Sequence, residues 1–214
     1  RGQGFSAIPV FLHRRFRHGF IFVNTSKGIS TPKDLNGKKV GLKTYQATAI
    51  LYLRGLLAEE YGVDLSSIDW ITELEEEIPF DPPPGIRITQ ASAGSDISEM
   101  LAEGEVDAVI HPDIIIPILR GDKRVRRLFE DYRAEEASYY RRTKIFPIMH
   151  ATAIRNEILE EHPWVSNNLA QAFERAKHAA YRRMSNPRIV PLAWFLDEWD
   201  AQRELLGPDP WEYG

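Results

Sequence analysis

Short apolar runs alternate with helical patterns through the middle of this 214-residue chain. Runs with the length of buried strands are expected at 5–10, 20–23, 39–42, 68–72, 86–91 and 106–110. Between them, residues 45–61 carry apolar side chains at i, i+3 and i+4, and residues 96–104 form a shorter helical segment. After a last apolar strand at 146–151 the pattern is purely helical, at 155–161, 165–184 and 192–206. The alternation predicts an α/β fold.

The stretch from Thr31 to Ala49 combines several local signals. Thr31 is suited to cap a short helix with Pro32 at its first position, and Asn36-Gly37 marks a turn. A strand, a small polar loop and a helix N-terminus then follow, and this order presents free N–H groups and a positive dipole end to an anion. We therefore expect Tyr45, Gln46 and Thr48 to bind an anionic or hydroxyl group. The alternative is an ordinary strand-to-helix turn without a ligand.

Charge is distributed unevenly along the chain. The net charge is −4, but residues 1–54 carry ten Lys or Arg and a single acidic residue, Asp34, so this segment is +9 and the remainder −13. A basic segment in an acidic protein favours a small anionic ligand over nucleic acid. The alternative is that distant carboxylates neutralise the segment in the fold. The absence of cysteine excludes disulfides and thiolate catalysis.

Three further expectations concern membrane spans, the N-terminal residues and the loop of residues 73–85. No apolar run reaches the roughly 18 residues that a membrane span needs. The opening residues RGQGFSAIPVF contain no Met and no targeting pattern, so we expect the natural chain to begin earlier. Residues 73–85 are acidic and include three consecutive prolines. We interpret this segment as a solvated surface loop, with a mobile lid as the alternative.

Candidate chemistry comes from arginines and histidines near the strand ends. Arg14, Arg17 and His18 precede an apolar strand, and arginine forks pair well with carboxylates. His111 follows a strand at the start of an HPD sequence, where ligands bind in open α/β sheets, and His150 lies on the strand at 146–151. The alternatives are surface arginines and hydrogen-bonded structural histidines. The three histidines match no local metal motif, so we expect no metal, although a divalent ion is possible.

Several segments together resemble the 4,5-dihydroxyphthalate decarboxylase family. They are AIPVFLHRRFRHGFIFVN, DLNGKKVGLKTYQATAILYLRGLLAEEYGV, LAEGEVDAVIHPD, FPIMHATAIRNEILEEHPWV and LGPDPWEYG. The resemblance implies a two-lobe type II periplasmic-binding-protein-like fold with a cleft between the lobes. Residues 1–23 and 148–214 would form the first lobe, and residues 24–147 the inserted α/β second lobe. Family chains are longer at the N-terminus, so the first lobe is expected to lack its N-terminal part.

The same resemblance implies an activity. It is a carboxy-lyase reaction that converts 4,5-dihydroxyphthalate to protocatechuate and CO2 by protonating the ring in the cleft, with no cofactor required. His111 or His150 would act as the acid/base, while Arg14, Arg17, His18, Tyr45, Gln46 and Thr48 would hold the substrate. The alternative is a solute-binding protein of an ABC transporter that captures a small anionic aromatic or thiamine-precursor-like ligand.

Partners and location follow from these two alternatives. The expected partner is a small aromatic carboxylate, with no nucleic acid, and the tryptophan-rich C-terminal helices are a possible homo-oligomer interface. An enzyme of this kind is expected in the cytoplasm and a transport receptor in the periplasm.

Overall fold

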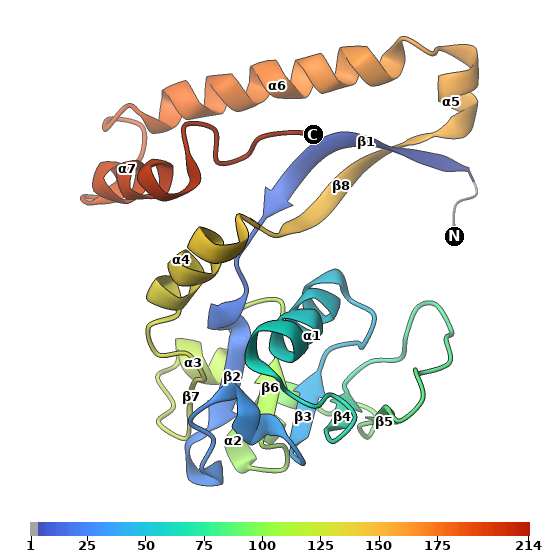
Figure 1. Cartoon of the computed structure of the whole chain (residues 1–214), viewed down its shortest axis with the longest axis vertical. Helices are drawn as coiled ribbons and strands as arrows, with labels where there is room; N and C mark the ends of the chain where they lie inside the picture. Colours follow the sequence, from blue (N-terminus) through green and yellow to red (C-terminus); the bar gives the residue numbers. More distant parts are fainter. Residues whose placement is uncertain (1–3) are drawn as a thin grey trace. The chain divides into compact units, whose positions relative to one another are not determined.

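The chain leaves one structural unit after Arg15, builds a second unit from Phe16–Ser138, and returns to the first with Tyr139–Gly214 (Figure 1). This description rests on a computed structural model, which describes residues 4–214. We call the discontinuous part the outer unit and Phe16–Ser138 the inserted unit. The lobes expected from the family resemblance divide the chain at 23/24 and 147/148 instead.

The inserted unit is built on a mixed six-stranded sheet in the order β5-β4-β3-β6-β2-β7. Strands β3, β4, β5 and β6 run parallel, and β2 is antiparallel to both β6 and β7. The bounds are β2 Ile21–Asn24, β3 Lys39–Leu42, β4 Asp69–Thr72, β5 Arg87–Gln90, β6 Ala108–Ile110 and β7 Val125–Arg127. This sheet, with helices between its strands, confirms the predicted α/β fold class.

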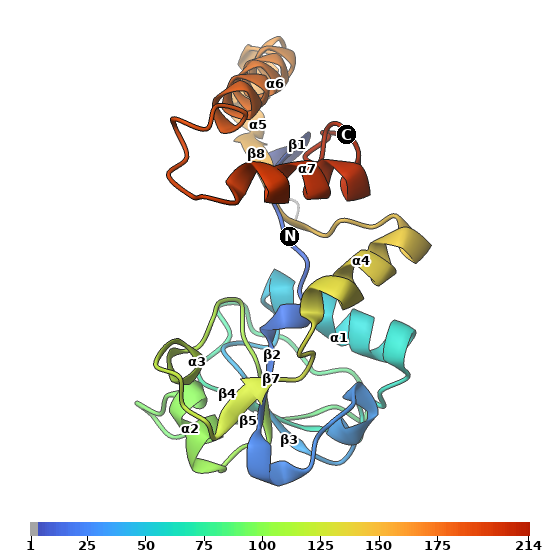
Figure 2. The same ribbon diagram turned by 90° about the vertical axis from the view of Figure 1, so that its left-hand side faces the viewer.

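Helices cover both faces of this sheet. In Figure 2, α1 (Thr48–Tyr61) lies on one face, and α2 (Ile97–Glu103) and α3 (Ile116–Leu119) lie on the other. Short 3-10 turns occupy His18–Phe20, Thr25–Lys27 and Pro32–Leu35. The side chains of Phe22, Ile97, Leu101 and Val109 are fully buried in one cluster between α2 and the sheet. Apolar burial of this kind supplies most of the stabilisation of the unit.

Strand register gathers several chain segments at one edge of the sheet. Leu42 at the end of β3 pairs with both Thr72 of β4 and Ile110 of β6. Ile110 also pairs with Ile21, the first residue of antiparallel β2. The residues that follow β3, β4 and β6 therefore meet those that precede β2. We call this the carboxyl edge, the part of an open α/β sheet at which ligands bind.

The outer unit contains a long antiparallel pair and three helices. Strands β1 (Phe5–Arg14) and β8 (Ile148–Arg155) lie side by side, and α6 (Val165–Met184) packs against β1 (Figure 1). The buried residues Ile8, Val10 and Ile154 form its apolar cluster. Helices α5 (Asn156–Glu161) and α7 (Phe195–Leu206) complete it, and α4 (Tyr132–Thr143) joins the units.

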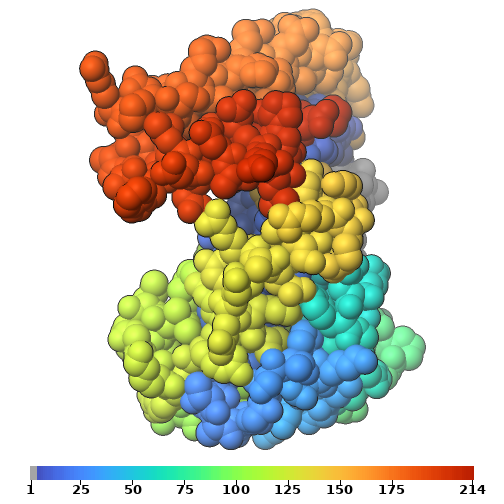
Figure 3. Space-filling model, turned by 60° about the vertical axis from the view of Figure 1, so that its left-hand side comes forward, coloured from blue at the N-terminus to red at the C-terminus, as the bar shows by residue number. Residues whose placement is uncertain are grey.

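The C-terminal residues of the outer unit are fastened to α6. In Figure 3 the red C-terminal part lies against the orange α6. Lys177 of α6, only 8% exposed, donates to the Asp209 carboxylate at 2.5 Å, and Tyr181 Oη donates to its other oxygen at 2.7 Å. No helix in residues 4–214 is long and apolar enough to cross a membrane.

Several individual elements differ from the expectations. Strand β1 continues to Arg14 instead of ending at Val10, because it pairs with β8 as far as Ile148. Helix α1 begins at Thr48, not at Tyr45. The short helix α3 was not predicted, although Pro117 sits at its first turn, where proline is tolerated.

Candidate active site

The HPD sequence, residues 111–113, forms the turn that follows β6 at the carboxyl edge. The His111 backbone N–H donates to Phe20 O at 3.1 Å, which joins this turn to the segment before β2. Arg17, 4% exposed, donates from Nη1 to Pro112 O at 2.7 Å. The buried guanidinium thus holds the turn that carries His111.

The His111 ring has a backbone partner in either charge state. Asp113 N–H donates to Nδ1 at 3.1 Å, which suits the neutral ring with its proton on Nε2. The Asp113 carbonyl oxygen lies 3.0 Å from the same Nδ1, and it accepts a hydrogen bond when Nδ1 is protonated. The side chain is partly exposed, so the ring is both oriented and accessible. These properties suit a group that delivers a proton.

His18 follows Arg17 directly in the sequence, but its side chain has a different environment. It is 1% exposed, and its ring contacts those of Tyr61 and Phe129 at centroid distances of 6.1 and 5.4 Å. Its Nδ1 lies 4.0 Å from Glu136 Oε1. A histidine enclosed in this way offers no ring nitrogen to solvent.

The turn before α1 binds a carboxylate supplied by the protein itself. The backbone N–H groups of Tyr45 and Gln46 donate to the two oxygens of Glu76, the latter at 3.2 Å. The Gln46 side-chain amide adds bonds to Glu76 Oε2 at 3.3 Å and to Ile78 O at 2.6 Å. A strand-to-helix turn was predicted to attract an anion, and Glu76 of the acidic loop occupies it. Whether Tyr45, Gln46 and Thr48 bind a ligand remains a prediction.

Arg54 brings a buried positive charge to the same turn. It is 8% exposed, its guanidinium carbon lies 3.5 Å from the centre of the Tyr45 ring, and Nη2 donates to Tyr45 O at 3.1 Å. Burial lowers the pKa of this guanidinium, while Tyr45 and the Glu76 charge act in the opposite direction. The N-cap of α1 is Ala47, whose side chain cannot accept a hydrogen bond, and Thr48 is exposed at the first helical position.

Two predicted residues belong to the outer unit. Arg14 donates to Phe146 O at 3.0 Å and to Glu212 O at 2.6 Å, so its guanidinium joins β1 to the chain end. Burial lowers its pKa, and Glu212 partly opposes this shift. His150 is exposed on β8, with its ring 4.9 Å from that of His13. The inserted unit holds the other six predicted site residues: Arg17, His18, Tyr45, Gln46, Thr48 and His111.

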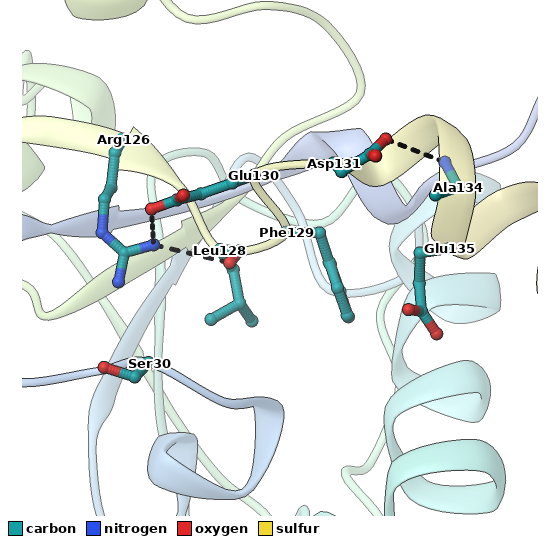
Figure 4. A pocket seen from close by; sticks show the side chains of 8 residues that line it. All are labelled: Ser30, Arg126, Leu128, Phe129, Glu130, Asp131, Ala134 and Glu135. Atoms are coloured by element: carbon teal, nitrogen blue, oxygen red, sulfur yellow. Dashed lines mark hydrogen bonds and ion pairs between the residues drawn. The ribbon is translucent and has the colours of Figure 1, made fainter.

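A hollow of about 530 Å³ lies elsewhere in the inserted unit, between Ser30, the end of β7 and the start of α4 (Figure 4). Its single arginine, Arg126, lies 3.8 Å from Glu130 and donates to Ile29 O. Asp131 and Glu135 add further negative charge to the lining. An aromatic dicarboxylate would be repelled there. Among residues 4–214, no three His, Cys, Asp or Glu side chains gather as metal ligands.

Sequence reasoning missed Glu76 and Arg54. Residues 73–85 were interpreted as a solvated loop, and nothing local indicates which of its glutamates returns to the sheet. Arg54 did leave a signal, since it follows the apolar stripe of α1 four residues after Ile50 and three before Leu57. A cation at such a position needs a partner inside the fold.

An oriented histidine and a turn that holds a carboxylate, at the carboxyl edge of an α/β sheet, are typical of the class of proteins that bind or convert small anions. No protein-family model matches the chain. It is 40% identical to a 4,5-dihydroxyphthalate decarboxylase of Comamonas testosteroni over 97% of this chain and 66% of that protein. A protein of the same name from Pseudomonas putida is 34% identical over 63% of this chain and 55% of its own length.

The chain belongs to the 4,5-dihydroxyphthalate decarboxylase family. It spans 66% and 55% of the length of these two relatives. Among solved structures, the periplasmic aliphatic sulphonate binding protein of Escherichia coli has a TM-score of 0.48 at 17% identity, covering 96% of this chain and 54% of its own. A Bordetella bronchiseptica protein has a TM-score of 0.49 at 17% identity, covering 100% and 61%.

Proposed function

We propose that this protein is a carboxy-lyase that removes one carboxylate from 4,5-dihydroxyphthalate and releases protocatechuate and CO2. The 40% identity to the Comamonas testosteroni decarboxylase over 97% of the chain is the observation that carries the proposal. The oriented His111 ring at the carboxyl edge supports it, because this reaction needs a proton donor.

The substrate is symmetric, so either carboxylate can leave while the other serves as an anchor. The hydroxyl para to the reacting carbon supplies electron density to that carbon and favours its protonation. In our proposal, doubly protonated His111 gives its Nε2 proton to the ring carbon that bears the leaving carboxylate. The C–C bond then breaks, its electrons restore the aromatic ring, and CO2 departs.

Hydrogen bonding of the His111 ring fits this proton transfer. In the imidazolium, Nδ1–H faces the Asp113 carbonyl oxygen at 3.0 Å, and this contact persists after Nε2 has lost its proton. Arg17 acts as a positioning residue through Pro112. Tyr45, Gln46 and Thr48 are proposed to hold the retained carboxylate, as N–H groups before a helix suit an anion. Roles for Arg14, His18 and His150 remain predictions.

Turnover by the full-length protein tests the proposal. The protein is incubated with 4,5-dihydroxyphthalate, with and without a chelator, and CO2 and protocatechuate are measured. We expect both products in equal amounts. A loss of turnover in the presence of the chelator would show that the reaction requires a metal ion. A ligand-induced rise in melting temperature without any CO2 would contradict the proposal and favour a binding protein.

A further inference from the structure

The carboxylate of Glu76 is held as a ligand would be held. Three N–H groups converge on it, from the backbones of Tyr45 and Gln46 and from the Gln46 side chain. Charge-assisted hydrogen bonds of this kind are stronger than neutral ones, and a carboxylate has acceptor sites for all of them. The turn is therefore already shaped for a carboxylate group, and the chain's own side chain fills it.

Arg54 supplies a second, independent sign of an anion site. It is 8% exposed, and its buried Nε atom has no hydrogen-bond partner within the described part of the chain. A buried guanidinium donor without a partner is costly. Its position beside Tyr45 places this spare donor at the same turn. Glu76 forms no hydrogen bond with this donor.

Glu76 lies in the loop of residues 73–85, which we call the strap. Its start is fixed, because Glu73 pairs with Lys43 Nζ at 3.0 Å and accepts from Ile97 N at 3.1 Å. Further along, Phe80 stacks on Tyr45 with ring centres 5.8 Å apart and planes 11° apart. Three prolines follow from residue 82, and no regular structure is assigned between β4 and β5. Beyond that start, Glu76 and Phe80 contact the turn through their side chains, and a competing ligand can displace these contacts.

We propose that Glu76 is a built-in competitor, and that an entering aromatic carboxylate displaces it from Tyr45 and Gln46. The ligand carboxylate takes over the N–H groups and gains Arg54 as a further donor, while the part of the strap beyond its fixed start at Glu73 moves away. This inference rests on the proposed function for its ligand class. It adds that ligand affinity is lowered by a carboxylate of the protein itself, so weakening that carboxylate should strengthen binding.

Titration calorimetry of the full-length protein with phthalate, which has both carboxylates but no hydroxyl groups, tests this directly. Glu76→Gln keeps the shape of the side chain and removes its charge. Glu77→Gln is the matched control, since Glu77 is exposed in the same strap. We expect Glu76→Gln to lower the dissociation constant about tenfold, equivalent to about 1.4 kcal/mol, and Glu77→Gln to match the wild type.

Other outcomes overturn the inference. They are unchanged or weaker binding by Glu76→Gln, equal gains in both variants, or no phthalate binding by any of the three proteins. A melting curve of each variant shows that it is folded. Phthalate binding that depends on Glu76, without turnover of 4,5-dihydroxyphthalate, would leave this inference standing and remove the decarboxylase proposal. Turnover of 4,5-dihydroxyphthalate with a KM that Glu76→Gln does not change would support the decarboxylase proposal and overturn the inference about Glu76.

Discussion

The buried guanidinium of Arg17 donates a hydrogen bond to the backbone carbonyl of Pro112 at 2.7 Å. This contact spans 95 positions in the sequence and joins the segment before β2 to the turn after β6. Pro112 follows His111 directly, so Arg17 holds the turn of the candidate proton donor, whereas the family resemblance implies that Arg17 binds the substrate.

Replacing Arg17 with Met tests this positioning role. The change leaves the partly buried Pro112 O without this partner, and an unsatisfied acceptor costs up to about 1–3 kcal/mol of unfolding free energy. Urea titration should show this loss, and kcat should fall more than KM rises if His111 is displaced. Arg182→Met, at an exposed position on α6, should change neither quantity. Normal kcat in a folded Arg17→Met variant would refute the positioning role.

Gly41 allows α2 to approach strand β3 closely. A Cβ at this position would collide with the side chain of Ile97, which is fully buried and cannot move aside. We expect Gly41→Ala to destabilise the protein by about 1–3 kcal/mol, as overpacked cores do.

Gly55 provides the control for that substitution. It lies within α1 with nothing within 4 Å of an added Cβ, so Gly55→Ala should stabilise by about 0.5–1 kcal/mol. Chemical denaturation of both variants distinguishes a steric effect from a general effect of alanine. Equal stability of the two would show that the Ile97 contact is unimportant.

Asp209 links the C-terminus to α6 in a pH-dependent manner. Burial alone would raise its pKa, but hydrogen bonds from Lys177 and Tyr181 lower the pKa below the ordinary 3.8. A lowered pKa in the folded state stabilises the protein above pH 3.8, and this contribution is lost as the pH falls through the folded-state pKa.

The variant Asp209→Asn should therefore be less stable than the wild type at neutral pH, by about 1–3 kcal/mol, because buried Lys177 loses a charged partner. Unfolding measured at several pH values should show the difference closing below pH 3.8. Asp200→Asn, at an exposed site of α7, serves as the control. A difference that persists unchanged in acid would mean that the Asp209 charge is not responsible.

Elements with local signals were predictable from the sequence. Thr31 and Asp34 form a capping box around the turn that Pro32 begins, and Gly62 ends α1 at a φ of 63°. The strand expected at residues 39–42 has the same bounds as β3, Lys39–Leu42. In each case residues a few positions apart determine the conformation.

Features that depend on distant partners were not predictable. The extension of β1 to Arg14 requires β8, more than 130 residues later. Glu76 reaches the Tyr45–Gln46 turn from about 30 residues away, and its neighbours Glu75 and Glu77 have the same local sequence. Local patterns therefore indicated that an anion binds at this turn, but not that the protein supplies one.

In the proposed reaction, His111 delivers the proton that releases CO2. The most direct measurement compares CO2 release from 4,5-dihydroxyphthalate by the full-length wild type, His111→Ala and the exposed-site control His162→Ala. Phthalate binding is measured in parallel. We expect His111→Ala to bind phthalate as the wild type does but to release at least about 100-fold less CO2, because one acid/base group contributes a factor of this size. Unchanged CO2 release by His111→Ala would contradict it.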